Sequence, residues 1–528
     1  MPRLHAPDLT QLGPLDEPSL ASAAPVVRPL RPPTGRLQNV LLVSHTDFTG
    51  NSALHVVAIA AELARLGLDP VVAVPQRPHE IGEISDVAVP TVAYRDVLDA
   101  RFADGRGPDI VHAFSPRELV RRLIVDVVDR FDVPYVVHLE DNDEAILAAH
   151  LGVEAALLRR LPIPILDELV GPSHAQPARA RRLLALAGGV TVITRRLLEL
   201  VPEDVPTRVV HAGYDPRLLD AAPSRAAARA ALTLPDDAFV LAYTGSVHAA
   251  NLDEVSTLYD AVGALRADGR RVVLVKTGTD DPERMHLPAL GEALRDLGRV
   301  PRTRVAEVLA AADALVQPGA PGVFNDFRFP SKLPDFLASG RPVVLPRTNI
   351  GADLENGVDA LLLEDGTTGE LVAALELLAD DPALRARLGA RGRAFALEHL
   401  SWSASAERVA DLYTEVAARP HTPAAPLEYA ELPVELAALV DAPPSEEDLR
   451  PAAAAGIAGF VRGAASPARD VQRAVLSGLV SRDERVQVVI AGDTGWDETR
   501  SAVTEALRRF YESCGLTLTE RQATRLIS

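Results

Sequence analysis

Residues 325–345 combine a cation, a carboxylate and the pattern of a short helix followed by a buried strand. The pattern predicts Ser331 as the N-cap of this helix and Gly340 as its end. A helix start offers unpaired backbone N–H groups and a positive dipole end, which together favour a bound anion. Lys332 lies in the first turn, where a cation is unfavourable for the helix alone, so a bound phosphate would explain it. Asp335, on the same turn, is placed to accept a hydrogen bond from a sugar hydroxyl.

Lysine is almost absent from the chain, although Lys and Arg together number 54. Only Lys276 and Lys332 are lysines, and both fall in the same predicted domain, near the end of a strand or the start of a helix. An ammonium is a compact point charge and a guanidinium is a planar fork, so a tight phosphate site need not accept the exchange. Two interpretations stay open: these lysines bind phosphate, or they remain by chance in a chain whose coding bias favours arginine.

The composition limits the class of protein. Hydrophobic residues make up 47% of the 528 residues, which supports two or three domains with well-buried cores. The net charge of −19 argues against nonspecific nucleic-acid binding, and the single cysteine, Cys514, excludes an internal disulfide and a cysteine metal cluster. No apolar run approaches the ~20 residues of a transmembrane helix, and the N-terminus lacks the pattern of a secretion signal. We therefore expect a cytoplasmic protein.

Strands and helices alternate along the first half of the chain. After a Pro-rich arm at residues 1–36, strands are predicted at residues 39–44, 70–74, 109–113, 134–139, 189–194 and 207–211. Their near-continuous apolar runs, with helical patterns between them, predict a doubly wound α/β sheet that gathers polar groups at the carboxyl ends of its strands. Gly50 stands alone in the first loop, so the dinucleotide fingerprint G-x-G-x-x-G is absent.

A second alternating unit follows a break at residues 213–216. Its predicted strands cover residues 239–244, 271–276, 314–317, 342–345 and 359–363. The sequence therefore predicts two Rossmann-like domains with a cleft between them, at residues 37–215 and 216–401, followed by an amphipathic helix at residues 402–417. Residues 419–528 are interpreted as a linker and a mostly helical extension, to which the sequence assigns no chemistry.

Several motifs in this order resemble a known family. They are the stretches 108–112 (PDIVH), 212–215 (AGYD), 243–246 (YTGS) and 329–344 (FPSKLPDFLASGRPVV). Over about residues 37–418 the chain resembles retaining glycosyltransferases of the GT-B fold, above all family 4. The resemblance implies that the second domain binds a nucleotide sugar, that the first holds the acceptor, and that the helix at residues 402–417 crosses back to the first. It also implies transfer without a metal ion or cofactor, to an acceptor glycan, a lipid-linked glycan or a small molecule.

The resemblance further implies a set of donor-binding residues in the second domain. Asp335 matches an acid that holds the nucleotide ribose. The family often has an Arg and a Lys after the pair that Gly245 and Ser246 form here, but this chain has neither. The cations that contact the diphosphate would then come from residues near the start of the short helix and near the end of the second strand of this domain. The implied set is Gly245, Ser246, Lys276, Arg328, Ser331, Lys332 and Asp335.

A further glutamate of the family lies eight positions before the ribose-binding acid. In this chain that position is Phe327, which cannot do the job of a carboxylate. Asp326 and Asn325 are one and two positions away, so a small change in the loop would place Asp326 on the donor sugar. Glu355 follows the turn at residues 349–352 and is a candidate for another acid of the family.

In the first domain the resemblance implies a His or a carboxylate that positions the sugar. The acceptor hydroxyl attacks from the side of the leaving group, and the phosphate itself takes the proton. His138, at the end of its predicted strand, is the first choice, ahead of His112 and His45. Each ring could instead be a neutral tautomer satisfied by backbone carbonyls. The acidic run at residues 140–144 is either functional or the solvated first turn of the next helix.

Other functions stay open at this point. The missing Arg and Lys and the unexplained extension favour a non-catalytic GT-B scaffold or binding protein in a larger assembly, and a sugar-nucleotide epimerase is a third alternative. Basic stretches at residues 121–122, 159–160 and 179–182 could dock the protein at the inner face of a membrane, although solvated helix faces explain them better. Residues 428–528 could contact a membrane or a protein partner.

Overall fold

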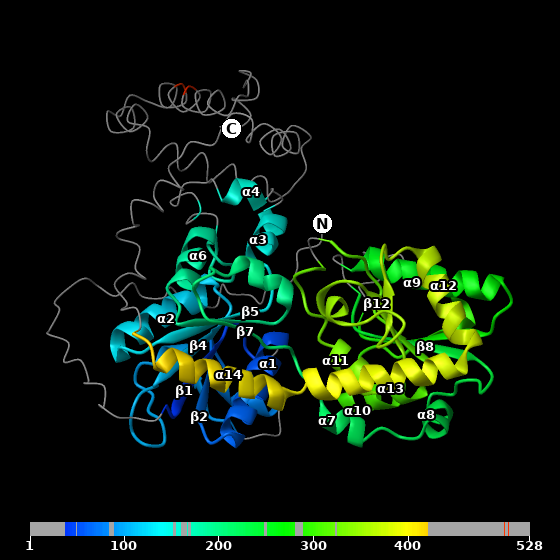
Figure 1. Cartoon of the computed structure of the whole chain (residues 1–528), viewed down its shortest axis with the longest axis horizontal. Coiled ribbons are helices and arrows are strands. Elements are labelled where there is room, and N and C mark those ends of the chain that lie inside the picture. The colour runs from blue at the N-terminus through cyan, green and yellow to red at the C-terminus, as the bar shows by residue number, and fades with distance from the viewer. Residues whose placement is uncertain are drawn as a thin grey trace.

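The structure is a computed structural model. It describes residues 37–420, apart from residues 49, 84–88, 152–154, 160–165, 167–169, 248–250, 280–288 and 323–324, together with residues 501 and 505. The predictions for the arm at residues 1–36 and for the extension after residue 420 lie outside these described residues. Figure 1 shows two α/β halves side by side, which we call the first and the second domain.

The first domain contains a seven-stranded parallel sheet with the strand order β3-β2-β1-β4-β5-β6-β7. Its strands are β1 (Asn39–Ser44), β2 (Asp69–Val74), β3 (Thr91–Ala93), β4 (Ile110–Phe114), β5 (Tyr135–Leu139), β6 (Gly189–Val192) and β7 (Thr207–Val209). Its helices are α1 (Asn51–Arg65), α2 (Glu118–Phe131), α3 (Asp143–Leu151), α4 (Ala155–Leu158) and α6 (Pro177–Ala185), with short 3-10 helices η2 (Pro78–Glu83), η3 (Tyr94–Asp96) and η4 (Arg195–Leu200). Strands β1, β4 and β5 are buried along their whole length, as their near-continuous apolar runs predict.

The second domain contains a six-stranded parallel sheet with the order β10-β9-β8-β11-β12-β13. Its strands are β8 (Phe239–Thr244), β9 (Val272–Thr277), β10 (Leu294–Asp296), β11 (Ala314–Val316), β12 (Val343–Pro346) and β13 (Leu361–Leu363). Its helices are α7 (Pro216–Asp220), α8 (Arg225–Ala231), α9 (Leu252–Ala267), α10 (Arg302–Ala311), α11 (Leu333–Ala338), α12 (Thr368–Asp380) and α13 (Pro382–His399), with 3-10 helices η5 (Gly291–Ala293) and η6 (Asn349–Asp353). Separate apolar clusters fill the two faces of this sheet.

The two parallel sheets confirm the predicted α/β class. Most predicted strands begin and end within one or two residues of the observed ones. The edge strands β3 and β10 were not predicted, because Pro90 interrupts the apolar run before β3 and two charged residues occupy β10.

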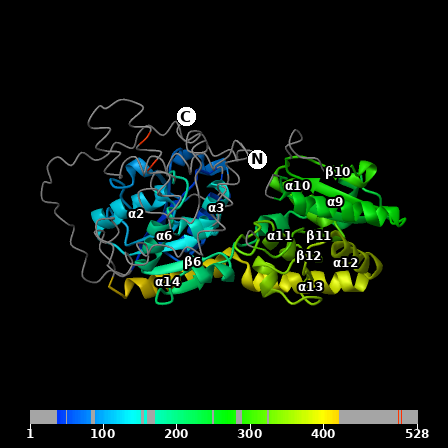
Figure 2. The ribbon, with the colours of Figure 1, turned by 90° about the horizontal axis from the view of Figure 1, so that it is seen from above.

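Helix α14 (Trp402–Ala417) leaves the second domain and packs on the first. Figures 1 and 2 show α13 and α14 one after the other along one side of both domains. The hydroxyl of Ser401 accepts a hydrogen bond from the Ala404 N–H at 3.1 Å and caps the helix start. A Cβ on Gly213 would lie 2.5 Å from the Trp402 backbone nitrogen, so the connection between the domains requires glycine there.

None of the helices within the described ranges combines the length and the apolar character needed to cross a bilayer.

A buried ion pair joins α8 to Asp313, the residue before β11. Removing this pair tests how much it stabilises the second domain. Arg229 donates to Asp313 at 2.5 Å, and both side chains are almost fully buried. We expect Asp313→Ala to lower the free energy of unfolding of the second domain by about 3–5 kcal/mol, because it leaves a buried guanidinium without its carboxylate. Urea unfolding followed by circular dichroism measures this change.

The matched control is Asp380→Ala, which breaks the pair between Asp380 and Arg270 on the surface. Because the Asp380 side chain is 63% exposed, its loss should change the free energy of unfolding far less than the loss of Asp313 does. Equal effects of the two substitutions would contradict the importance of the buried pair.

Candidate active site

Lys332 lies where the carboxyl end of β8 meets the start of α11. Its Nζ is 3.9 Å from the centroid of the Tyr243 ring. Gly245 follows β8 with a φ of +143°, and a Cβ at this position would lie 3.0 Å from the same Nζ. Glycine therefore leaves room for the ammonium and supplies a backbone conformation that other residues rarely adopt.

The start of α11 differs from the prediction. Lys332, not Ser331, is the N-cap residue, and the helix has only six residues. The N–H of Leu333 donates to the carbonyl of Pro330 at 3.0 Å, which closes a turn and leaves Ser331 exposed. The predicted capping role of Ser331 is therefore wrong. Pro334 does fall in the first turn, where its missing N–H costs no hydrogen bond.

Positive charge gathers around Lys332. Arg328 donates to Glu254, in the first turn of α9, at 2.9 Å. Lys276 is fully buried near the end of β9, with its Nζ 3.9 Å from the Asp296 carboxylate. Burial lowers the pKa of Lys332 to about 7, helped by the charges of Arg328 and Lys276 and opposed by Glu254. An anion bound beside Lys332 would therefore stabilise its charged form.

The loops after β8 and β9 are joined at this edge of the sheet. The Thr279 N–H donates to Ser246 Oγ at 3.1 Å, and the two hydroxyls of this pair are also 3.1 Å apart. The Asn251 side chain donates to the Ser246 carbonyl at 3.1 Å. A Cβ on Gly278 would lie 2.3 Å from the Gly245 carbonyl carbon, so this close contact of two loops requires glycine. Gly245 is thus held beside Lys332, with Ser246 next to it in the chain. That these two residues bind the donor stays a prediction.

Asp335 faces the segment that connects the domains. Its Oδ1 accepts the Asp215 N–H at 2.8 Å, and its Oδ2 is 3.4 Å from Arg302. Burial raises the pKa of Asp335 to about 6, while Arg302 and the Asp215 N–H oppose the rise. The prediction that Asp335 binds a ribose stays a prediction, because both of its oxygens have protein partners here.

The side chain of Asp326 is satisfied within its own part of the second domain. It accepts hydrogen bonds from the Thr348 hydroxyl and from the Gly322 N–H, the latter at 3.2 Å. Asn325 donates to Glu254 and to the Ala320 carbonyl. The predicted contact of Asp326 with the donor sugar stays untested.

Two of the three candidate histidines of the first domain, His112 and His138, share one buried hydrogen-bond network. His112 contacts the Tyr413 hydroxyl of α14 at 2.8 Å and Thr191 Oγ1 at 3.0 Å. Because both ring nitrogens have partners and the residue is fully buried, His112 is a structural core residue and the predicted catalytic role does not fit. His138 contacts the same Thr191 Oγ1 at 2.8 Å, and burial lowers its pKa to about 4. His138 is therefore neutral near pH 7.

Glu140 was not among the predicted catalytic residues, although it directly follows β5. His55 Nδ1 is 2.9 Å from its carboxylate, and the Ser52 hydroxyl also donates to it. Burial raises the pKa of Glu140, but the hydrogen bond and charge of His55 outweigh it and hold the pKa well below its usual range. Burial and the neighbouring carboxylates raise the pKa of Asp141 to about 7. The acidic run after a buried strand was the signal in the sequence, but the pairing with α1 is visible only in three dimensions.

The rest of the acidic run begins α3, which starts at Asp143. The Asn142 side chain accepts the Ala145 N–H at 3.0 Å, as an N-cap residue does. The run therefore divides into a buried carboxylate and a helix start. In the described part of the chain, no three or more His, Cys, Asp or Glu side chains are grouped so that they could hold a metal ion.

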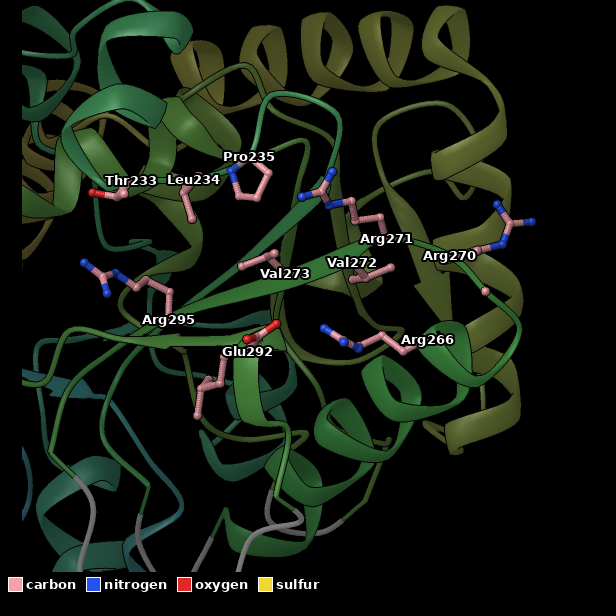
Figure 3. A pocket seen from close by; sticks show the side chains of 12 residues that line it. Thr233, Leu234, Pro235, Arg266, Arg270, Arg271, Val272, Val273, Glu292 and Arg295 are labelled. Atoms are coloured by element: carbon pink, nitrogen blue, oxygen red, sulfur yellow. The ribbon is translucent and has the colours of Figure 1, made fainter.

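The cavity in Figure 3 lies at the opposite edge of the second sheet. It has a volume of about 600 Å³, and the side chains of Arg266, Arg270, Arg271 and Arg295 surround it near the amino end of β9. None of the residues predicted to bind the donor lines it. Because open parallel sheets bind ligands at the carboxyl ends of their strands, the candidate active site is the edge around Lys332.

Comparisons with known proteins agree with this architecture. Residues 238–381 match the family described as Glycosyl transferases group 1. A D-inositol 3-phosphate glycosyltransferase of Kineococcus radiotolerans is 27% identical over 416 residues, which is 70% of this chain and 91% of that protein. A protein of the same name from Streptomyces griseus subsp. griseus is 31% identical over 209 residues, 37% of this chain and 43% of that protein. Other curated relatives are matched over about half of their length.

Solved structures show the same fold at low sequence identity. HepE of Anabaena, crystallised in complex with UDP, has a TM-score of 0.53 and 14% identity, and the match covers 71% of this chain and all of that one. Sucrose-phosphate synthase from Thermosynechococcus elongatus has a TM-score of 0.52 and 16% identity, with 72% of this chain and 99% of that one covered. The two parallel sheets therefore have the GT-B fold of these solved structures, and residues 238–381 of the second domain match a glycosyltransferase family.

Proposed function

We propose that this chain transfers a sugar from a nucleotide-sugar donor to an acceptor hydroxyl, with retention of the anomeric configuration and without a metal ion. The observation that carries the proposal is the position of Lys332, beside Gly245 and among other cations at the carboxyl edge of the second sheet. A diphosphate here would meet the Lys332 ammonium and the Arg328 guanidinium. These charges would stabilise the negative charge that develops on the leaving diphosphate.

The protein groups near the loop favour a reaction without a covalent intermediate. Asp326, the carboxylate expected near the donor sugar, already accepts two hydrogen bonds in its own domain. In the proposed reaction the acceptor oxygen forms the new glycosidic bond on the face from which the donor phosphate leaves. The departing phosphate oxygen takes the hydroxyl proton. Because the new bond forms on the face from which the phosphate leaves, the sugar keeps its configuration.

The acceptor would be held by the first domain. Glu140, with its low pKa, is the candidate to accept a hydrogen bond from an acceptor hydroxyl at the end of β5. Several relatives are named D-inositol 3-phosphate glycosyltransferases, so a polyol phosphate is the first acceptor class to test. Glycans and lipid-linked glycans follow.

One alternative has an observation in its favour. Glu254 already pairs with Arg328, and Asp335 already contacts Asp215 and Arg302. A donor would have to compete with these partners, as expected if the chain were a non-catalytic GT-B scaffold. Nucleotide binding separates the two functions.

The first prediction from the proposed function concerns nucleotide binding. In a thermal-shift panel of UDP, GDP and ADP and their glucose conjugates, we expect one nucleotide to raise the Tm, because a ligand at 100 times its Kd stabilises the folded state by about 2.7 kcal/mol. Lys332→Ala should abolish the shift. Arg270→Ala, a cation at the opposite edge, should keep it. If none of these nucleotides raises the Tm of the wild-type protein, the result would favour the non-catalytic scaffold.

The second prediction concerns the ligand-free protein. The pKa of Lys332 is lowered from 10.5 to about 7, so the unfolded chain binds the proton more tightly than the folded one. This lowers the stability near pH 7, and the loss disappears as the pH rises toward the ordinary lysine value. Lys332→Met should therefore raise the Tm of the ligand-free protein at pH 7, by about 2 °C or more. A lower Tm would show that the ammonium stabilises the fold.

The third prediction concerns protons. Because the pKa of Lys332 is about 7 without ligand, a bound diphosphate should raise it and binding should take up a proton at pH 8. The affinity for the nucleotide sugar that responds in the panel should fall as the pH rises above 7, by up to about tenfold per unit. Calorimetry in two buffers of different ionisation enthalpy counts the protons. In Lys332→Arg, which stays charged, uptake should disappear.

A further inference from the structure

The loop that leads into α11 contacts both domains. Phe327 packs against the apolar core cluster of the first domain, whereas Phe329 packs against the core clusters of both domains. Arg328, between them, reaches Glu254 of the second domain at 2.9 Å. Pro330 restricts the preceding Phe329 to extended backbone, which limits how the loop can enter α11.

The first domain receives the two rings with side chains of its own. The Arg196 guanidinium lies 5.8 Å from the centroid of the Phe327 ring. The His211 ring stacks on Phe329, with centroids 5.9 Å apart and an interplanar angle of 28°. His211 is itself fixed, because its Nδ1 donates to the Ile193 carbonyl at 2.8 Å. Its own carbonyl accepts the hydroxyl of Ser405, on α14, also at 2.8 Å.

A second contact joins the domains beside the rings. Arg195 Nε donates to Asp353, at the end of η6, at 2.7 Å. His211 Nε2 is 3.7 Å from the other oxygen of the same carboxylate. Because the Arg195 side chain is 69% exposed, this ion pair adds little energy, and the aromatic contacts account for most of the attachment. We call the whole set the interdomain clasp: Arg195, Arg196 and His211 of the first domain with Phe327, Phe329 and Asp353 of the second.

We propose that Phe327 and Phe329 are positioning residues for the donor site. By docking on the first domain they hold the loop so that Arg328 and Lys332 stand at the donor diphosphate. The affinity for the donor then depends on contact between the domains, through two rings that are not required to touch the ligand. The inference rests on the proposed function for the identity of the ligand, but the contact itself does not depend on it.

Phe327 also occupies the position at which the resemblance expects a glutamate on the donor sugar. The structure gives this position a different task, since the ring packs on the first domain. A carboxylate there would lose the apolar contact. The departure from the family pattern and the interdomain clasp therefore have one physical explanation.

The test compares Phe327→Ala, Phe327→Leu and the matched control Phe395→Ala in the full chain. Phe395 is also partly buried, but it packs against the core of the second domain and against His399, and it is not packed against the core of the first domain. UDP, GDP and ADP are each titrated by calorimetry. Hydrogen exchange is measured for the amides of residues 193–197 and 325–333. We expect Phe327→Ala to speed exchange in both segments and to weaken nucleotide binding by about tenfold to 100-fold, as misplacement of a binding group does.

Phe327→Leu keeps an apolar side chain and should retain most of the nucleotide affinity. Phe395→Ala should lower the Tm but leave the nucleotide affinity unchanged. Unchanged exchange in Phe327→Ala, or unchanged affinity despite faster exchange, would overturn the proposal. If the wild-type protein binds none of the three nucleotides, the proposed function fails. The exchange data then still decide whether the rings hold the loop on the first domain.

Discussion

The candidate active site depends on one ammonium group, that of Lys332, which is buried near other cations and therefore costs stability. The Lys332 ammonium lies against the Tyr243 ring and beside Gly245, with other cations near it and burial lowering its pKa to about 7. A fold that needed only stability would place an apolar side chain there. Such a position is typical of a group whose charge is stabilised by a ligand, because functional sites are where burial and like charges shift pKa values.

The architecture explains why this position is available. In a parallel sheet all strands end at the same edge, and the loops after β8 and β9 meet there near the start of α11. Glycines at positions 245 and 278 let these two loops touch through their backbones. The site is thus built from loops on rigid strands, which hold Gly245 beside the ammonium.

The first domain and α14 are tied together by polar contacts inside an apolar core. Tyr413 of α14 reaches His112, and Thr191 contacts both His112 and His138. A buried network of this kind is stable only when its members find partners, so it fixes how α14 lies on the sheet. It also buries a neutral His138, whereas Glu140, one residue beyond the end of β5, keeps its charge beside His55 and Ser52.

The sequence by itself determined the elements whose pattern is local: the parallel strands from their apolar runs, the helices between them, and the segment that brings Lys332 to a helix start. It also indicated the glycosyltransferase resemblance, because those motifs are continuous in the chain. Only the tertiary structure decided that His112 is a core residue, since its partner Tyr413 is 301 positions away. The same holds for Phe327, whose partners come from the other domain, and for Ser331, whose capping role was displaced by a turn closed at Pro330. Helices and strands can be predicted because their patterns involve residues close in the sequence. The role of a side chain depends on its partners in the folded structure, which can be far away in the sequence.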